Sequence, residues 1–350
     1  MRHFPAHVIK ASVVLCLFAF LICGSLLNNA TRSTKMEHSK KSFISLVFSS
    51  NATWIKPNAT HKEMCRWLKT LKHPEKLCRR RRGLPELLHE TRKLAVSSCM
   101  EQFEYEQWNC SRTNIKKYFK KIFRETALMH SLVTSALMYT VARACAEGKL
   151  ANCKCASHGK SENSSDFEWG GCGDNIKYAK KLTKKILQLK KKGDNYSNII
   201  RYNSEVGMKA VVKHNVKKCD CHGMSKSCTL KICFMRVEPF VKIAENLRQL
   251  YHTAVKVKPD SDLEPYKKKT HLVFLENSPN FCGQLGAYGV TTSGRRCKDE
   301  NNCATLCCTR GHTSVKKVFD ENCKCKWIHS NPLTLQCAKC AKEETFYYCR

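Results

Sequence analysis

Four cysteines surround a six-residue loop near the middle of the chain, and a serine lies at the tip of that loop. The cysteines are Cys219, Cys221, Cys228 and Cys233, and Ser225 lies between the inner two. If the outer and inner pairs were bridged in nested fashion, they would close a hairpin with Ser225 at its tip. A short loop under two bridges has little conformational freedom. Such a loop can display one side chain.

The same spacing has two other interpretations. The loop could be a surface knuckle whose serines only satisfy hydrogen bonds of the turn. Alternatively, a Cys-x-Cys pair with two further cysteines can hold a zinc ion. The spacing alone does not decide between a loop that displays a side chain, a structural surface turn and a zinc site.

The N-terminus has the layout of a secretory signal peptide over residues 1–24. Arg2 and Lys10 are followed by an apolar run, Ala11–Cys23, that ends in small residues. An uncleaved signal anchor is the alternative. No later stretch is long and apolar enough to cross a bilayer. We therefore expect a protein that enters the endoplasmic reticulum and is secreted to the extracellular space and matrix.

Export changes how the cysteines are interpreted. Two of the 24 cysteines lie in the predicted signal peptide, which leaves 22, an even number. In an oxidising compartment this predicts disulfides and makes zinc less favoured. No metal or cofactor is expected. The glycosylation sequons fit the same route, and they begin at Asn29, Asn51, Asn58, Asn109, Asn163 and Asn195.

The chain is strongly basic, with a formal net charge of +33. For an exported protein the natural anionic partners are sulfated glycosaminoglycans such as heparan sulfate, and membrane surfaces, rather than nucleic acid. A solvated basic face without a partner is the alternative for any single cluster. The basic clusters lie at 79–82, 116–121, 180–192 and 267–269.

The chain divides by composition into five segments. After the signal peptide, residues 25–60 form a polar leader that we expect to be flexible. Residues 61–257 read as a helical domain, 258–270 as a linker, and 271–350 as a cysteine-rich domain with β-prone runs such as His271–Leu275. Because the last segment has ten cysteines in 80 positions and few apolar residues, disulfides should hold it together.

Apolar periodicity predicts the helices of the second segment. One begins at Leu84–Pro85, and a longer one carries an apolar stripe from Phe119 to Val141 and ends at Gly148. A basic helix is predicted with Asp174 as its cap and Gly193 as its end. Two more are expected, over 196–213 and after Pro239.

Six motifs in order resemble the Wnt family of secreted, lipid-modified signalling glycoproteins over nearly the whole mature length. Any one of them is weak, but the ordered set is specific. They are Cys99 with Gln107-Trp-Asn-Cys110, Cys145-Ala-Glu-Gly148, Trp169-Gly-Gly-Cys172, Cys221-His-Gly-Met-Ser225, Glu276-Asn-Ser-Pro-Asn-Phe-Cys282, and Leu306-Cys-Cys-Thr-Arg-Gly-His312.

The resemblance implies a fold and a function. The fold is α+β: a helical N-terminal domain with a lipid-bearing hairpin, and a cystine-stapled C-terminal domain with a finger-like β-hairpin. It implies that Porcupine esterifies Ser225 with a mono-unsaturated C16 fatty acid and that Wntless carries the product. The lipid would enter the cysteine-rich domain of a Frizzled receptor. An LDL-receptor-related protein or a receptor tyrosine kinase would be co-receptor. The output would be Wnt signalling in development, in cell fate and polarity.

The resemblance also implies a disulfide pairing that leaves two cysteines, Cys65 and Cys78, to pair with each other. The implied bridges are Cys99–Cys110, Cys145–Cys153, Cys155–Cys172, Cys219–Cys233, Cys221–Cys228, Cys282–Cys308, Cys297–Cys303, Cys307–Cys349, Cys323–Cys340 and Cys325–Cys337.

Two positions depart from the family pattern. The residue after Ser225 is Lys226, where the family has glycine, and this places a cation beside the expected ester. At the finger tip, the family's adjacent pair of cysteines is absent. The resemblance still implies receptor contacts at the loop and at the finger tip, where apolar residues remain. The expected receptor-binding residues are Met224, Ser225 and Lys226 in the loop, and Trp327, Ile328 and Leu333 at the tip.

An enzyme is not expected. Cys307-Cys308 before Gly311-His312 is similar to the histidine site of secreted phospholipases, but the aspartate beside the histidine is missing. No Gly-x-Ser-x-Gly elbow surrounds Ser225. A heparin-binding matrix or inhibitor protein without a lipid is the second alternative, supported by charge and cysteines but not by the ordered motifs.

Overall fold

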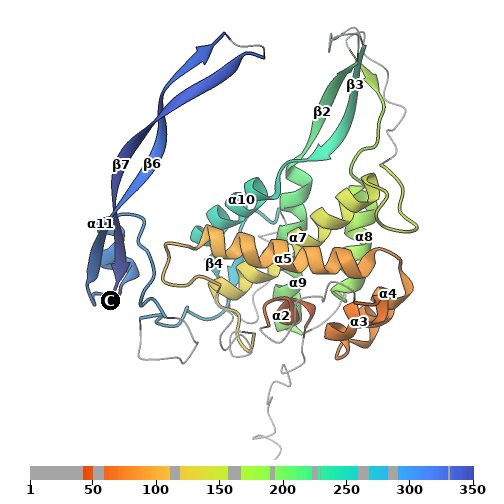
Figure 1. Cartoon of the computed structure of the whole chain (residues 1–350). Coiled ribbons are helices and arrows are strands. Elements are labelled where there is room, and N and C mark those ends of the chain that lie inside the picture. Colours follow the sequence, from red (N-terminus) through yellow and green to blue (C-terminus); the bar gives the residue numbers. More distant parts are fainter. Residues whose placement is uncertain are drawn as a thin grey trace, which may run out of the picture. The chain divides into compact units, whose positions relative to one another are not determined.

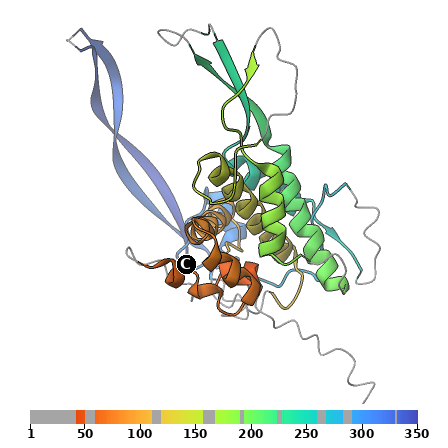
Figure 2. The same cartoon turned by 90° about the vertical axis from the view of Figure 1, so that its right-hand side faces the viewer.

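The computed structural model (Figures 1 and 2) describes ten stretches of the chain. The predicted signal peptide, four sequons (Asn29, Asn51, Asn58 and Asn163) and the loop residues Met224, Ser225 and Lys226 lie outside them. The described residues are 42–49, 59–110, 119–156, 167–189, 194–222, 228, 230–258, 268–282, 291–329 and 332–350.

The helical part is built around one buried helix, α7 (Arg124–Ala146). Most of its residues are buried all round, so it has no polar face. Helices α5 (Leu84–Gln102), α8 (Ile176–Ile186), α9 (Asn195–Lys213) and α10 (Phe240–His252) pack against it. These helices share one apolar core.

Three buried hydroxyl groups inside α7 are satisfied by the helix itself. The hydroxyl groups of Ser131, Thr134 and Ser135 donate to carbonyl oxygens three or four residues earlier, at 2.8, 2.7 and 2.8 Å. A buried hydroxyl without a partner would cost free energy, and this back-bonding avoids that cost. A helix rich in serine and threonine can therefore stand at the centre of the core.

The crossing of α9 over α7 depends on Gly207. A Cβ atom at this position would lie 2.1 Å from the carbonyl oxygen of Ser131. No side chain fits at that distance, so the glycine allows the two backbones to touch. Tyr202, Val206 and Val211 of α9 then bury their side chains in the shared core.

Part of the predicted flexible leader belongs to the fold. Residues Phe43–Val47 form α2, capped by Ser42, and Phe43, Ile44 and Val47 are buried in the helical core. The prediction of a flexible segment over 25–60 is therefore wrong for these residues. The prediction followed the polar composition of the whole segment and gave too little weight to its short apolar run, Phe43–Val47. The short elements α3 (His61–Met64), η1 (Arg66–Leu68) and α4 (Lys72–Arg80) follow, and Figures 1 and 2 show them beside α2.

The predicted helices are confirmed with changed boundaries. The long helix begins at Arg124, so Phe119, Ile122 and Phe123 precede it although they continue its apolar stripe. Its end near Gly148 is confirmed. Helix α8 is capped by Asn175, not by Asp174 as predicted, because the Asn175 side chain accepts from the Tyr178 amide at 2.9 Å. It ends at Ile186, well before Gly193.

Residues 271–281 pack with the helical part, whereas they were predicted to open the C-terminal domain. The side chain of Asn203 pairs with the backbone of Val273 in both directions, at 2.9 and 3.0 Å. Strand β5 (Val273–Phe274) pairs in parallel with β4 (Val255–Lys256). Leu272, Val273 and Phe274 are buried in the helical core. The C-terminal region with its own core therefore begins after Phe281.

The C-terminal region has a small core of its own. It consists of Leu306 with Cys297, Cys303, Cys307 and Cys349, and it lies around α11 (Glu300–Leu306). A long antiparallel pair, β6 (His312–Ile328) and β7 (Thr334–Cys349), extends from it. Among the described helices, none is long and apolar enough to cross a lipid bilayer.

A buried histidine in α7 makes the stability of the fold depend on pH. The His130 side chain lies within the core, its Nδ1 has no hydrogen-bond partner among the described residues, and its ring packs edge-on against Phe119. Burial lowers the pKa of His130 to about 4. The folded state therefore keeps the ring neutral at a pH where the unfolded chain, with an ordinary pKa near 6.5, binds a proton.

We predict that this residue destabilises the fold as the pH falls from about 6.5 toward 4. Between pH 7 and pH 5 the loss is about 2 kcal/mol of the free energy of unfolding. In His130→Leu this part of the pH dependence should vanish, while His252→Leu, at an exposed site, should keep it. Denaturant unfolding with the disulfides intact at both pH values checks this. An unchanged pH dependence in His130→Leu would contradict the prediction.

Candidate functional site

The loop predicted to display Ser225 lies at the end of an antiparallel hairpin. Strands β2 (Asn215–His222) and β3 (Leu230–Val237) pair from Asn215 opposite Val237 to His222 opposite Leu230. Most of β2 is exposed. Figure 1 shows the hairpin continuing from the end of α9. The pairing therefore carries the chain outward from the helical core before the loop begins.

Two disulfides close this hairpin. One joins Cys219 to Cys233, which lie directly opposite each other in the register, and the other joins Cys221 to Cys228. Because all four sulfur atoms are in bridges, they offer no thiolates to a metal ion, and the zinc alternative does not apply here. The pairing shortens the free loop to the residues between His222 and Cys228.

The root of the hairpin is braced by a third strand. Strand β1 (Glu168–Trp169) runs parallel beside β3, and the Gly170 amide donates to the Cys233 carbonyl at 3.0 Å. A Cβ atom on Gly170 would lie 2.8 Å from Cγ2 of Ile232, so this approach favours glycine. The motif from Trp169 to Cys172 therefore supports the hairpin rather than carrying chemistry.

Two further disulfides connect this brace to the helical core. Cys145, near the end of α7, is bridged to Cys153, and Cys155 is bridged to Cys172, which follows β1. Between the two bridges the chain advances by only two residues, from Cys153 to Cys155. Residues 153–155 are therefore bridged on one side to the end of α7 and on the other side to the segment after β1.

Asp174 connects the brace to the end of β3. Its Oδ2 accepts from the Val237 amide at 2.7 Å, and its own amide donates to the Met235 carbonyl at 2.9 Å. The side chain is buried, and burial raises the pKa of its carboxyl group, although Arg143 and Arg236 oppose this shift. Asp174 thus satisfies a buried backbone donor at the point where the hairpin meets the helices.

The two sides of the hairpin root are also joined by a side-chain hydrogen bond. Nδ1 of His214 lies 2.8 Å from Oε2 of Glu238, and the Glu238 amide donates to the His214 carbonyl at 2.9 Å. Lys242 contacts the other carboxylate oxygen at 2.6 Å. These contacts hold the end of α9 against the start of α10, so both strands leave the core from fixed positions.

The second hairpin, β6–β7, is long and exposed on both faces. Two disulfides cross it near its tip, where a bulge interrupts the register between Cys323 and Lys326. A bulge increases local twist and changes which side chains face which way. The conformation of the distal end therefore depends on this bulge and on the bridges Cys323–Cys340 and Cys325–Cys337.

Large apolar side chains stand in water at this tip, as the sequence predicted. Trp327 is 64% exposed, Ile328 41% and Leu333 53%. Leu335, which the sequence analysis did not single out, pairs with Trp327 and is 51% exposed. The sequence does indicate it, because Leu333 and Leu335 alternate with Thr334 as residues on one face of a β-strand do.

The root of β6–β7 is a cluster of cystines. Sulfur atoms of Cys297, Cys307 and Cys349 lie close enough to suggest a metal site, with 3.6 Å between the first two. All three are already bonded, because Cys297 is bridged to Cys303 and Cys307 to Cys349. Bonded sulfur atoms offer no thiolate, so this cluster is structural.

The disulfides that the family resemblance implied are confirmed in every case. Among the described residues all eleven bridges form, and the pair left over by the resemblance, Cys65–Cys78, is one of them. The other ten are Cys99–Cys110, Cys145–Cys153, Cys155–Cys172, Cys219–Cys233, Cys221–Cys228, Cys282–Cys308, Cys297–Cys303, Cys307–Cys349, Cys323–Cys340 and Cys325–Cys337.

Two of the predicted basic clusters meet on one surface. The Arg81 guanidinium donates to the Tyr178 hydroxyl, which ties the end of α4 to α8. Glu75 is the acid of α4, and it pairs with Arg79 at 2.7 Å. The exposed basic residues on α4, on α8 and at position 82 are together called the α4–α8 face, and they are Lys72, Lys76, Arg79, Arg80, Arg82, Lys177, Lys180, Lys181, Lys184 and Lys185.

Comparison with known protein families places these features in a known context. The chain matches the model of the Wnt family over residues 67–350. It belongs to the Wnt family. Members of this family are signalling ligands rather than enzymes, so the phospholipase-like spacing around His312 is set aside.

Individual Wnt proteins match over most of the chain. Protein Wnt-4 of Drosophila melanogaster is 38% identical over 82% of this chain, and the match spans 56% of that protein. Protein Wnt-9a of Gallus gallus is 33% identical over 83% of this chain and 87% of that protein. A solved complex of human WLS with WNT8A is similar in structure, with a TM-score of 0.54, 27% identity, and coverage of 76% of this chain and 94% of that one.

The two sequons among the described residues of this Wnt chain differ in access. Asn195 is exposed at the start of α9. Asn109 is half-buried, and its Oδ1 is enclosed without a hydrogen-bond partner in the described part of the chain. In the folded protein the Asn195 side chain is therefore more accessible than that of Asn109.

We predict that the hydrogen bond of Asp174 matters more than its charge. Asp174→Ala leaves the Val237 amide buried without an acceptor and should lower the free energy of unfolding by about 1–3 kcal/mol. Asp174→Asn keeps an acceptor oxygen and should cost less than about 1 kcal/mol. Backbone hydrogen exchange of residues 230–237 should rise in the alanine variant only. Equal effects of the two substitutions would contradict this account.

Proposed function

We propose that this Wnt protein is a secreted, fatty-acylated ligand that binds Frizzled receptors at two places. The first is a mono-unsaturated C16 acyl chain esterified to Ser225, and the second is the tip of the β6–β7 hairpin. Secretion fits the predicted signal peptide and the eleven disulfides of the described residues. The observation that carries the proposal is the β2–β3 hairpin, which is bridged twice and braced at its root.

The physics of lipid display favours such a hairpin. Each methylene that a receptor groove buries contributes about 0.8 kcal/mol, so one acyl chain can dominate a binding interface. Fixing the hairpin beforehand reduces the ordering cost of binding. Strands β2 and β3 remain paired up to His222 and Leu230, so the backbone on both sides of the proposed acylation site is already ordered before binding.

The proposed partners follow from the lipid and from the relatives. Porcupine would form the ester, and Wntless would shield the acyl chain during transport. The solved complex of WNT8A with WLS supports a carrier of this kind for this chain. An LDL-receptor-related protein or a receptor tyrosine kinase would complete the signalling complex and pass on Wnt signals in development.

We predict that Ser225→Ala abolishes incorporation of an alkyne fatty acid and impairs secretion and signalling, because the hydroxyl that forms the ester is lost. Ser227→Ala, in the same loop, is the matched control and should be labelled normally. Mass spectrometry of the 219–233 peptide from secreted protein locates the acyl group. An unmodified loop peptide in active secreted protein would favour a matrix or inhibitor protein without a lipid.

We predict that Trp327→Ala weakens binding to an isolated Frizzled cysteine-rich domain by roughly thirtyfold, as expected for a lost aromatic anchor of about 2 kcal/mol. Secretion and acylation should remain, since the side chain is 64% exposed. Val318→Ala, equally exposed on the same hairpin but away from the tip, should bind normally. Unchanged affinity of Trp327→Ala would place the second contact elsewhere.

We also propose that the α4–α8 face binds heparan sulfate, because its cations are gathered on two tied helices. Replacing Lys180, Lys181, Lys184 and Lys185 by glutamine should lower the salt needed to elute the protein from heparin. Four exposed ion pairs at about 0.5 kcal/mol each correspond to roughly thirtyfold in affinity. Replacing the hairpin lysines Lys316, Lys317, Lys324 and Lys326 should have a smaller effect. Equal effects would mean that charge alone, not this face, binds heparin.

A further inference from the structure

A short turn after α5 forms part of the helical side of a contact with the C-terminal region. It covers residues 103–107 and is held by the Cys99–Cys110 bridge. Its first residue, Phe103, is buried and packs edge-on against Trp108 and Tyr251, each with ring centroids 5.1 Å apart. The turn is therefore anchored in the helical core on one side, while its carbonyl groups face outward.

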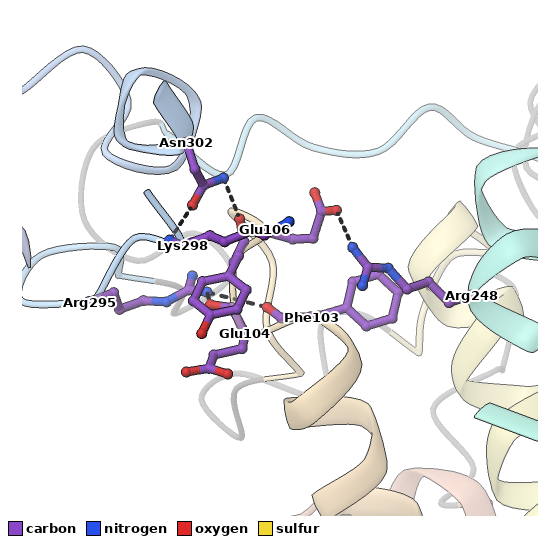
Figure 3. Close-up of polar contacts among 8 residues, drawn as sticks. Phe103, Glu104, Glu106, Arg248, Arg295, Lys298 and Asn302 are labelled. Carbon is purple, nitrogen blue, oxygen red and sulfur yellow. Dashed lines mark hydrogen bonds and ion pairs between the residues drawn. The ribbon is translucent and has the colours of Figure 1, made fainter. Parts of the chain in front are cut away.

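Arg295 of the C-terminal region donates to three of these carbonyl groups, and Figure 3 shows the two that belong to Phe103 and Glu104. Its guanidinium reaches the carbonyl oxygen of Gln107 at 2.9 Å, that of Glu104 at 2.6 Å and that of Phe103 at 3.3 Å. The turn follows the C-terminal end of α5, where the helix dipole favours a cation. A planar guanidinium with several fixed donors suits such a set of acceptors.

The main chain of the same residue belongs to the root of the β6–β7 hairpin. The Cys349 amide donates to the Arg295 carbonyl at 2.9 Å. On either side of Arg295, Gly294 donates to the Cys349 carbonyl at 2.8 Å and Cys297 donates to the Tyr347 carbonyl at 2.9 Å. Arg295 thus holds the last residues of β7 with its backbone and the helical part with its side chain.

The contacts around Arg295 are polar as well. The Asn302 side chain donates to the Tyr105 carbonyl at 3.2 Å (Figure 3). The Gln107 side chain donates to the Thr305 carbonyl at 2.9 Å, and Arg296 donates to the Tyr105 hydroxyl at 2.8 Å. Within the described parts of the chain, the two apolar cores share no residue. Polar groups account for the contacts named above.

The covalent connection leaves rotational freedom that the polar contact removes. Phe281 packs on the helical core, and the next residue, Cys282, is bridged to Cys308. A single bridge limits distance, but the bonds of a cystine can rotate. Three hydrogen bonds from one planar group to three separate acceptors resist rotation, because turning the group toward one acceptor moves it away from the others.

We propose that Arg295 is the positioning residue that holds the β6–β7 hairpin in one fixed relation to the helical part, so that its tip and the Ser225 loop engage one receptor together. The functional half of this inference rests on the proposed two-site binding. The structural half does not, because it concerns only how the two parts of the chain are held. The Gln107-Trp108 motif is explained by the same contact, since it supplies one acceptor carbonyl and the donor to Thr305.

The structural half is tested by hydrogen exchange on the full-length secreted, acylated protein without receptor. Arg295→Met keeps the length of the side chain but removes its donors. It should raise exchange at least tenfold both in the 103–107 turn and in residues 294–297 and 347–349. Exchange in α7 should remain at the wild-type level, which shows that the helical core is folded. Lys298→Met, at an exposed lysine three residues further along, is the control and should behave as wild type.

The functional half is tested by a double-mutant cycle on receptor affinity. Arg295→Met should weaken binding to a Frizzled cysteine-rich domain about tenfold in the wild-type background, but less than about twofold in Trp327→Ala, because a tip that no longer binds gains nothing from being positioned. A merely structural loss would lower affinity equally in both backgrounds, and that result would overturn the functional half.

The outcomes separate this inference from the proposed function. If Trp327→Ala binds normally, the proposed tip contact fails, while exchange still decides whether Arg295 holds the two parts together. Wild-type exchange in Arg295→Met, or a rise on one side of the contact only, overturns the inference. If Arg295→Met is not secreted, Arg295→Lys is measured instead. Lysine keeps the positive charge but lacks the planar guanidinium with its several donors. Exchange clearly above that of the wild type supports the inference, and exchange equal to that of the wild type overturns it.

Discussion

A two-stranded hairpin with water on both faces is at best marginally stable, and this constraint governs the whole molecule. The β6–β7 hairpin is of this kind, and the outer part of β2–β3 is similar, because only the two-residue strand β1 pairs with β3 on its other side. Cross-strand bridges replace the missing burial, since each reduces the freedom of the unfolded chain. The bridges Cys219–Cys233 and Cys323–Cys340 thus let paired strands extend beyond the two cores.

The helical part and the C-terminal region are stabilised in different ways. The helical part buries enough apolar surface around α7 to fold in the ordinary way, and cystines such as Cys145–Cys153 secure the connections that leave its helices. The C-terminal region buries little beyond Leu306 and four half-cystines. A region so poor in apolar residues cannot be fixed to its neighbour by a large apolar interface. Directional hydrogen bonds, such as those of Arg295, are what remains.

How well the sequence predicted the fold depended on how local each signal was. Helices α9 and α10 were expected at nearly their observed bounds, because their periodicity is complete within the helix. The start of α7 was placed too early, since Phe119 and Ile122 continue its apolar stripe without its backbone. Asp174 was taken for a helix cap because its partner, Val237, lies 63 residues away.

The candidate site shows the same limit. The clustering of Cys219, Cys221, Cys228 and Cys233 pointed to a closed loop, but the pairing of all the bridges came only from the family resemblance. The role of Arg295 left no local trace, because its acceptors are backbone carbonyl groups about 190 residues earlier. A carbonyl is present at every residue, so no side-chain pattern marks it as an acceptor.

The length of β6–β7 has a further consequence, which concerns self-association. Each of its two strands is an edge, with backbone donors and acceptors along one side that no other described strand covers. Such edges are templates on which another copy of the chain can add a strand. Lysines on β6 and β7, among them Lys316, Lys326 and Lys339, and the bulge after Cys323 are features that discourage this addition. The basic residues of the hairpin therefore oppose growth of this exposed β-ribbon into a fibre, because strands of two copies would bring like charges together.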